Sequence, residues 1–343
     1  MANVIIGIHG LGNKPEKDLL ENWWKISMEE GLNTAGYNRK LPDFEMAYWA
    51  DIVYDKPNNL HEKDENNPCF LDEPYIRGSK DFHVSPSDNR IKIVDFLGKQ
   101  MNRIFLDDDY SLNYSFITDA ILNKYFKDLE IYYSKNISEL HNRECTLNQL
   151  IRERLAALLE KHRDDEIMLI GHSMGSIIAY DVLTFMKPDI RVKTFITIGS
   201  PLGLPVVLSK IAAERKEAGL ESFPINVPEA ITGEWINYSD ILDKVAFNYS
   251  LSDDFSENSH GIKPADYLVV NNYESEGGPN AHKAYGYLRT KEFATALNEF
   301  ILSEKPMPEQ KTRTGIDKFI SNIKERLLSK LKRAKSLKEP KDT

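Results

Sequence analysis

The chain has 343 residues, a hydrophobic content of 41% and a net charge of −9, which suits one large or two small soluble domains with a substantial core. No stretch reaches the apolar length of a membrane span, and a strand-like run begins within three residues of the start, so we expect neither a membrane helix nor a secretory signal. Two cysteines without metal-ligand spacing, Cys69 and Cys145, favour reduced thiols. We therefore expect a cytoplasmic protein that holds no metal.

The charge is divided unevenly along the chain. Residues 311–343 carry eleven Lys or Arg against four Asp or Glu, a balance of +7, so the preceding residues carry −16. This division predicts a basic appendage that either has its own partner or folds back onto an acidic body. The acidic body and the lack of a nucleic-acid-binding motif argue against a nucleic-acid partner.

The N-terminal elements predict the start of a parallel sheet. Residues 3–8 form an apolar run typical of a strand buried on both faces, and the glycine-rich loop His9–Asn13 follows it. Such a loop can turn backbone N–H groups towards a ligand, and we expect Leu11 to supply half of an oxyanion hole. An amphipathic helix over 17–35 and a short strand over 44–49 come next.

Residues 51–145 interrupt this rhythm and predict an inserted helical cap, because loops of this length in a compact domain are usually functional. We expect its aromatic residues to pack within the cap in preference to contacting a ligand. They are Phe96, Phe105, Tyr110, Tyr114, Phe116, Tyr125, Phe126, Tyr132 and Tyr133. The run Asp107–Asp109 lacks the spaced ligands and turn glycine of a calcium loop and favours a solvated turn.

The strongest motif follows the cap. Thr146 and Gln149 form a capping-box pattern that opens a helix over 147–162. An apolar strand at 167–170 then meets a helix at Met174 through Gly-His-Ser-Met-Gly, residues 171–175, which fits the G-x-S-x-G turn that lifts a serine clear of a sheet. Ser173 is the predicted nucleophile and Met174 the second oxyanion donor. With the strand at 192–199, the βαβαβ order implies a doubly wound parallel sheet whose active site lies at the carboxyl ends of its strands.

A catalytic serine needs a histidine to take its proton and a carboxylate to orient that histidine. Two aspartates follow a strand at 234–239, and we favour Asp243 because its D-x-V-A continuation lets the chain turn into packing, with Asp240 in reserve. Of eight histidines, His282 alone follows the last strand, 266–271, in a loop before a final helix at 284–302. Its type and place suit a general base at neutral pH.

Together these motifs resemble the α/β-hydrolase superfamily, and within it bacterial lipases and serine esterases. The resemblance rests on HGLGN, GHSMG, GSPLG, the W-x-N-x-x-D-x-x-D-x-V-A stretch and H-x-x-Y, and it covers roughly residues 1–50 and 145–303. It implies an α/β-hydrolase core formed by 1–50 and 146–303, the triad of Ser173, Asp243 and His282, and no cofactor. The chain departs from the fuller family pattern by lacking the leading hairpin.

Residues 304–343 form a basic tail in which 315–338 predict an amphipathic helix. Such a helix either lies on an anionic membrane surface, which would make the protein peripheral, or packs against the body or a partner subunit. The leading hypothesis is a serine hydrolase of small-molecule or lipid-like carboxylic esters. The alternatives are a non-catalytic binding or membrane-tethering protein on a hydrolase scaffold, and a thioesterase, acyltransferase or amidase that uses the same triad.

Overall fold

The computed structural model of the chain describes residues 2–78, 129, 132–133, 137–140, 143–246 and 250–303. The aromatic residues expected in the cap before Tyr132, the run Asp107–Asp109 and the basic tail lie outside these residues. The sheet, its helices and the candidate site all belong to the part of the chain up to residue 303.

The centre of the fold is a six-stranded sheet in the order β10-β8-β6-β5-β1-β2. Every neighbouring pair is parallel. The strands are β1 (Asn3–Ile8), β2 (Asp43–Ala47), β5 (Glu166–His172), β6 (Val192–Ile198), β8 (Ile231–Asp240) and β10 (Pro264–Val269). This arrangement confirms the predicted α/β fold with a mostly parallel, doubly wound sheet.

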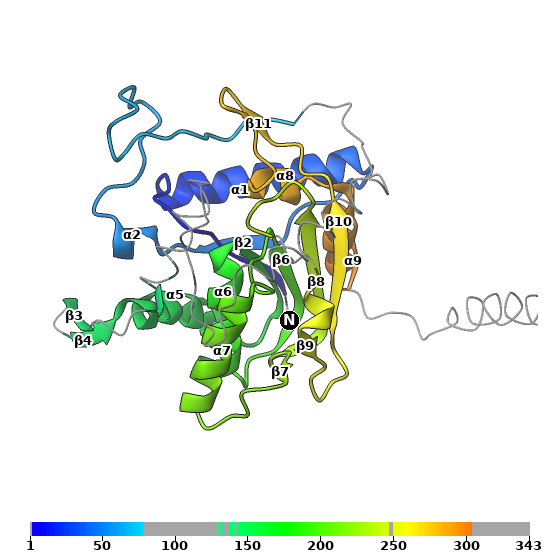
Figure 1. Ribbon diagram of the computed structural model, residues 1–343. Coiled ribbons are helices and arrows are strands. Elements are labelled where there is room, and N and C mark those ends of the chain that lie inside the picture. The colour runs from blue at the N-terminus through cyan, green and yellow to red at the C-terminus, as the bar shows by residue number, and fades with distance from the viewer. Residues whose placement is uncertain are drawn as a thin grey trace, which may run out of the picture. The chain divides into compact units, whose positions relative to one another are not determined.

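Helices cover both faces of the sheet (Figure 1). One face packs against α1 (Lys17–Thr34), α8 (Ala284–Leu288) and α9 (Lys291–Leu302), and the other against α5 (Leu147–Lys161), α6 (Met174–Asp181) and α7 (Pro205–Glu217). Alternate residues of one strand therefore enter different cores: Ile5 packs with the first helix group, and Ile6 packs with the second. This two-sided burial explains why the central strands β1, β5 and β6 are largely apolar instead of alternating.

Three details differ from the sequence prediction. The final helix is broken at Thr290, whose hydroxyl accepts a hydrogen bond from Phe293 N at 3.3 Å and so caps a new helix. The last strand ends at Val269, two residues early, because Asn271 N donates to the Asp240 carboxylate instead of continuing a ladder. Thr146 does precede α5, but its hydroxyl contacts Asn148, so the expected capping box does not form.

Shorter elements surround the sheet. They are α2 (Ala50–Val53), the π-helical turn η2 (Val182–Met186), the 3₁₀ turn η3 (Leu251–Asp253), the antiparallel pairs β3 (Ile137–Leu140) with β4 (Arg143–Thr146) and β11 (Glu274–Ser275) with β12 (Gly278–Pro279), and the parallel pair β7 (Ile225–Asn226) with β9 (Phe255–Ser256). Among the described residues, no helix has the length and apolar character to cross a membrane.

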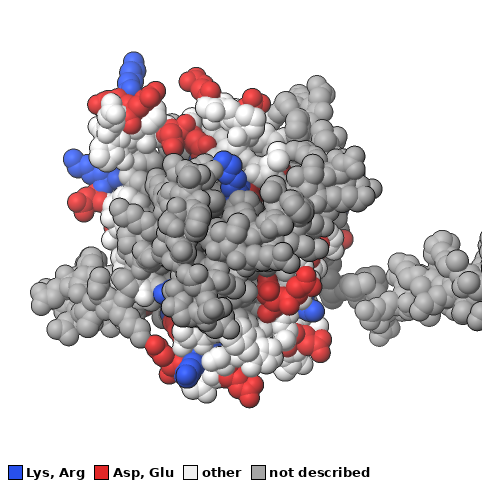
Figure 2. All heavy atoms as spheres, viewed as in Figure 1, with Lys and Arg blue, Asp and Glu red and all other residues white. Residues whose placement is uncertain are grey.

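On the face seen in Figure 2, acidic side chains gather in several patches among separate basic ones. Large apolar side chains that are exposed, such as Leu60, Phe223 and Tyr267, come from separate loops and an edge strand. Isolated apolar side chains of this kind are normal on a protein surface.

Candidate active site

Ser173 occupies a strained turn between β5 and α6. Its φ of 52° and ψ of −127° lie in a region that side chains rarely adopt, and it is the one non-glycine residue with positive φ in the described ranges. A Cβ at Gly171 would approach Ser176 Cα to 2.8 Å, and one at Gly175 would overlap Ile8 O. Both positions of the motif therefore require glycine for close packing, as a nucleophile elbow does.

Two buried hydroxyl groups support this turn from behind. Ser176 Oγ donates to Ser173 O at 2.6 Å, and Ser200 Oγ lies 2.7 Å from Ser176 Oγ. Since the Ser176 proton is used on the carbonyl, Ser200 is the donor in the second bond. The strained peptide of the elbow is thus held by a chain of two hydrogen bonds.

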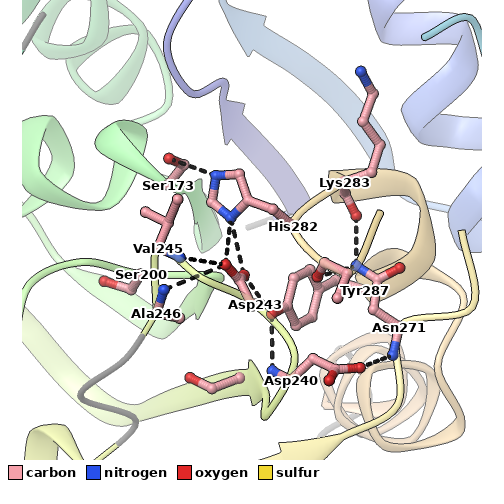
Figure 3. A network of polar contacts seen from close by, with 12 residues as sticks. Ser173, Ser200, Asp240, Asp243, Val245, Ala246, Asn271, His282, Lys283 and Tyr287 are labelled. Carbon is pink, nitrogen blue, oxygen red and sulfur yellow. Dashed lines mark hydrogen bonds and ion pairs between the residues drawn. The ribbon is translucent and has the colours of Figure 1, made fainter. Parts of the chain in front are cut away.

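The structure brings Ser173, His282 and Asp243 together (Figure 3). His282 Nε2 lies 3.0 Å from Ser173 Oγ, and His282 Nδ1 lies 2.9 Å from each carboxylate oxygen of Asp243. The carboxylate can only accept from Nδ1–H, which leaves Nε2 to accept the serine proton. The Asp243 side chain is fully buried, whereas 22% of the His282 side chain is exposed.

Further donors hold the Asp243 carboxylate. Val245 N and Ala246 N lie 2.9 and 3.3 Å from Oδ1, and the Tyr287 hydroxyl donates to Oδ2 at 2.7 Å. Burial, and then the Asp243 charge, raise the pKa of Tyr287 well above its usual value, so this hydroxyl stays protonated. These three bonds satisfy the buried Asp243 carboxylate.

Asp240, the reserve candidate, lies apart from His282 in this network. Its carboxylate accepts from Leu242 N at 2.7 Å and from Asn271 N at 2.6 Å, and its own N–H donates to the Tyr287 hydroxyl at 2.8 Å. The two aspartates are therefore linked through one tyrosine, with Asp243 beside the histidine.

The loop after β1 lies directly against the nucleophile, since a Cβ at Gly10 would come within 2.8 Å of Ser173 Cβ. His9 Nδ1 donates to Gly10 O at 2.8 Å, while His9 Nε2 accepts from Trp49 N at 3.0 Å. Because the C=O and N–H of a trans peptide point in opposite directions, this bond turns the Leu11 N–H away from His9. Burial lowers the pKa of His9 well below its usual value and keeps the ring neutral.

The second expected donor opens a helix. Met174 is the first residue of α6, and the first amides of a helix have no acceptor within it. The other carbonyls of the β1 loop converge on the Lys14 ammonium, which contacts the oxygens of Leu11, Gly12 and Asn13. Lys14 thus fixes the loop that carries the first donor.

Comparison with known proteins finds a family model and a curated relative that are similar to parts of this chain. A family model described as the PGAP1-like alpha/beta domain, which is of the α/β-hydrolase type, matches residues 97–245. These similarities and the parallel sheet support the assignment of the chain to the α/β-hydrolase superfamily. A protein of Saccharomyces cerevisiae named as the probable phospholipase YOR022C, mitochondrial, is 28% identical over 126 residues, which are 36% of this chain and 16% of that protein. No solved structure matched significantly.

Beside the elbow, next to Met174, lies a small apolar pocket of about 30 Å³. Both expected oxyanion residues line it, together with side chains from α2, the cap and α5. The lining residues are Leu11, Gly12, Trp49, Val53, Tyr54, Tyr132, Leu147, Ile151 and Met174.

Residues 54–78, which we call the strap, are tied to both sides of the site although the sequence assigned them to the cap. Near its start, Asn58 N donates to Lys14 O at 2.8 Å behind the oxyanion loop. Near its end, Glu73 pairs with Lys283 at 2.8 Å, next to His282. The strap therefore connects the two loops that carry Leu11 and His282, the residues predicted as oxyanion donor and base.

Sequence reasoning missed several residues that support the candidate site. Gly199, within the GSPLG motif, has a φ of 54°, and a Cβ there would lie 2.8 Å from Asp243 Oδ2 and 3.1 Å from His282 Nδ1. The sequence showed a glycine at this position of the motif, but it did not show why a glycine is required there. Nothing in the sequence marked Tyr287 or the role of His9. In the described ranges, no group of three His, Cys, Asp or Glu side chains is placed to hold a metal ion.

Proposed function

We propose that the chain is a serine hydrolase that cleaves carboxylic esters of lipid-like acyl groups through an acyl-enzyme. The observation that supports this reaction is the hydrogen-bond chain from Ser173 through His282 to the buried Asp243, with the serine on a strained turn. The superfamily assignment supports hydrolase chemistry in general.

In this reaction, Ser173 Oγ attacks the ester carbonyl carbon while His282 Nε2 takes the hydroxyl proton. The negative charge on the carbonyl oxygen is stabilised by the N–H groups of Leu11 and Met174. Collapse of the intermediate breaks the bond to the alcohol, which leaves with the proton held by His282. Water then attacks the acyl-enzyme with His282 as base, and the free acid departs. Asp243 stabilises the imidazolium in both halves.

The lining of the pocket and the name of the yeast relative both favour an acyl ester of lipid type. The pocket is apolar and touches the residues expected to hold the oxyanion, so it would receive the acyl side of the ester. The relative is named as a probable phospholipase, although the match covers only 16% of it.

Hydrolysis of p-nitrophenyl esters of increasing acyl length tests the proposal. We expect Ser173→Ala to abolish turnover and Asp243→Asn to lower kcat by about 10⁴-fold, since an asparagine favours the wrong imidazole tautomer. Asp240→Asn is the matched variant, and a greater loss there than at Asp243 would reverse the assignment of the acid. A parallel series of acyl thioesters compares the thioesterase alternative.

Absence of serine-dependent turnover at every length, together with no labelling of Ser173 by a fluorophosphonate, would contradict the hydrolase proposal. The binding or tethering alternative would then take first place.

The apolar stripe and basic residues of 315–338 favour contact with an anionic membrane in either case, and we propose a peripheral location for the protein on that ground.

A further inference from the structure

Two side chains outside the triad hold three consecutive backbone carbonyls around His282. Asn271 Nδ2 donates to Ala281 O at 2.9 Å and to Lys283 O at 2.7 Å. His172 Nε2 lies 2.7 Å from His282 O. The peptide groups before and after the base are therefore fixed from two directions.

His172 connects this backbone to the nucleophile, because it immediately precedes Ser173 in the elbow. A carbonyl oxygen can only accept, so His172 Nε2 carries the proton in this bond. The ring is buried, and its centroid lies 4.9 Å from that of His282. Burial, and then the charge on His282, lower the pKa of His172 well below its usual value, so it remains a neutral donor.

Asn271 connects the same backbone to the acid. Its own N–H donates to the Asp240 carboxylate at 2.6 Å, and Asp240 N donates to the Tyr287 hydroxyl that binds Asp243 (Figure 3). Its Oδ1 accepts from Tyr273 N at 3.0 Å, so every polar atom of its side chain is used. A Cβ at Gly286 would overlap this Oδ1, which shows how closely the amide is enclosed.

We infer that His172 and Asn271 are positioning residues for the general base. This inference rests on the proposed function and identifies the residues that position the His282 side chain. The base is delivered by a loop that also carries the hairpin of β11 and β12, so its distance to Ser173 depends on these backbone bonds. A displacement of about 1 Å is enough to lower a catalytic rate about 100-fold.

Variants at His172 separate the donor from the ring. We expect His172→Phe, which keeps a ring of similar size but removes the donor, to lower kcat about 10- to 100-fold with KM little changed. His172→Gln can again donate to the carbonyl and is expected to recover most of the loss. A glutamine variant as slow as the phenylalanine variant would overturn the role of His172.

Variants at Asn271 have a matched control in Asn258. Asn258 Nδ2 also donates to two carbonyls, those of Pro228 at 3.0 Å and Ile231 at 2.9 Å, and it is equally buried. Asn271→Asp should lower kcat about 10- to 100-fold, whereas Asn258→Asp should lower stability without changing kcat. If both variants lose kcat equally, the effect is general destabilisation and the inference fails.

Gly286→Ala gives a second test at the same place, because it displaces the Asn271 amide without altering its chemistry. We expect it to reproduce the loss of kcat in Asn271→Asp. Normal kcat in a folded Gly286→Ala protein would contradict the role of Asn271.

A readout without turnover separates this inference from the proposed function. The proton between His282 Nδ1 and Asp243 should give a low-field resonance in the NMR spectrum of the full chain, which we expect to weaken in His172→Phe and Asn271→Asp but not in Asn258→Asp. An unchanged resonance in the first two variants would overturn the positioning role. Wild-type protein that shows the resonance but neither hydrolyses esters nor reacts with a fluorophosphonate would instead contradict the proposed function.

Discussion

Replacing Tyr287 by phenylalanine removes the hydroxyl that bridges the Asp243 carboxylate and the Asp240 backbone N–H. The ring is fully buried, and its hydroxyl donates to Asp243 at 2.7 Å while accepting from Asp240 N at 2.8 Å. A hydrogen bond to a charged group contributes about 1.5–3 kcal/mol and a neutral one about 1 kcal/mol. The expected loss in the free energy of unfolding is therefore about 3 kcal/mol, or roughly 6–12 °C in Tm.

The assay is chemical denaturation at pH 7.5 together with kcat on a p-nitrophenyl ester. We expect kcat to fall about tenfold, because Asp243 keeps its two backbone donors but loses the hydroxyl. Tyr180→Phe is the matched control: this buried hydroxyl donates to Asn226 O at 2.9 Å, so about 1 kcal/mol and no kcat should be lost. Equal stability losses in the two variants would refute the reasoning.

The same tyrosine predicts a dependence on alkaline pH. The pKa of Tyr287 is raised in the folded protein by burial first and by Asp243 second. The folded state then keeps its proton above about pH 10, where an unfolded tyrosine loses it. The stability that the hydroxyl contributes is complete below pH 10 and declines above it, so the difference between wild type and Tyr287→Phe should narrow there.

Three further predictions concern stability, specificity and the tail. Arg152→Met should lower the free energy of unfolding by about 3–5 kcal/mol, because it removes the cation that lies 2.6 Å from the buried Asp181. Burial already raises the pKa of Asp181 to about 6, so its carboxylate destabilises the folded state as the pH rises from about 4 through 6. A loss of unfolding free energy in urea that is no larger at pH 8 than at pH 5 would contradict this reasoning. Val53→Trp, at the partly exposed rim of the pocket, should lower kcat/KM for long acyl esters about tenfold more than for acetate, and an unchanged length profile would place the acyl chain elsewhere. Removal of residues 304–343 should reduce sedimentation with anionic vesicles at low salt and leave neutral vesicles unaffected, whereas equal binding by the shortened chain would remove the membrane role of the tail.

Sequence periodicity predicted most of the sheet because the central strands β1, β5 and β6 are buried on both faces and are therefore largely apolar. It failed at element ends, where one side chain decides the boundary. Thr290 divides the last helix by capping a new one, and Asn271 ends the last strand by turning its N–H to Asp240. These contacts join residues whose proximity exists only in the folded chain.

For the candidate site, chain order and residue type were enough to select Ser173, Asp243 and His282, which the structure places within hydrogen-bond reach of one another. Neither could show the groups that support them. The neutral state of His9 depends on burial against Trp49, and the need for glycine at 199 depends on two side chains that approach from distant loops. The acyl specificity, the membrane contact and the role of the cap beyond residue 78 stay predictions.

The strap has a consequence for protein engineering. A cap exchange planned from the sequence boundaries would remove residues 51–145. Such a graft would discard Asn58 and Glu73, and with them the bond to Lys14 in the loop after β1 and the ion pair to Lys283 next to His282. A chimera that keeps the native chain through Gly78 and exchanges only the cap residues after it should retain the reactive centre while acquiring the donor's substrate range.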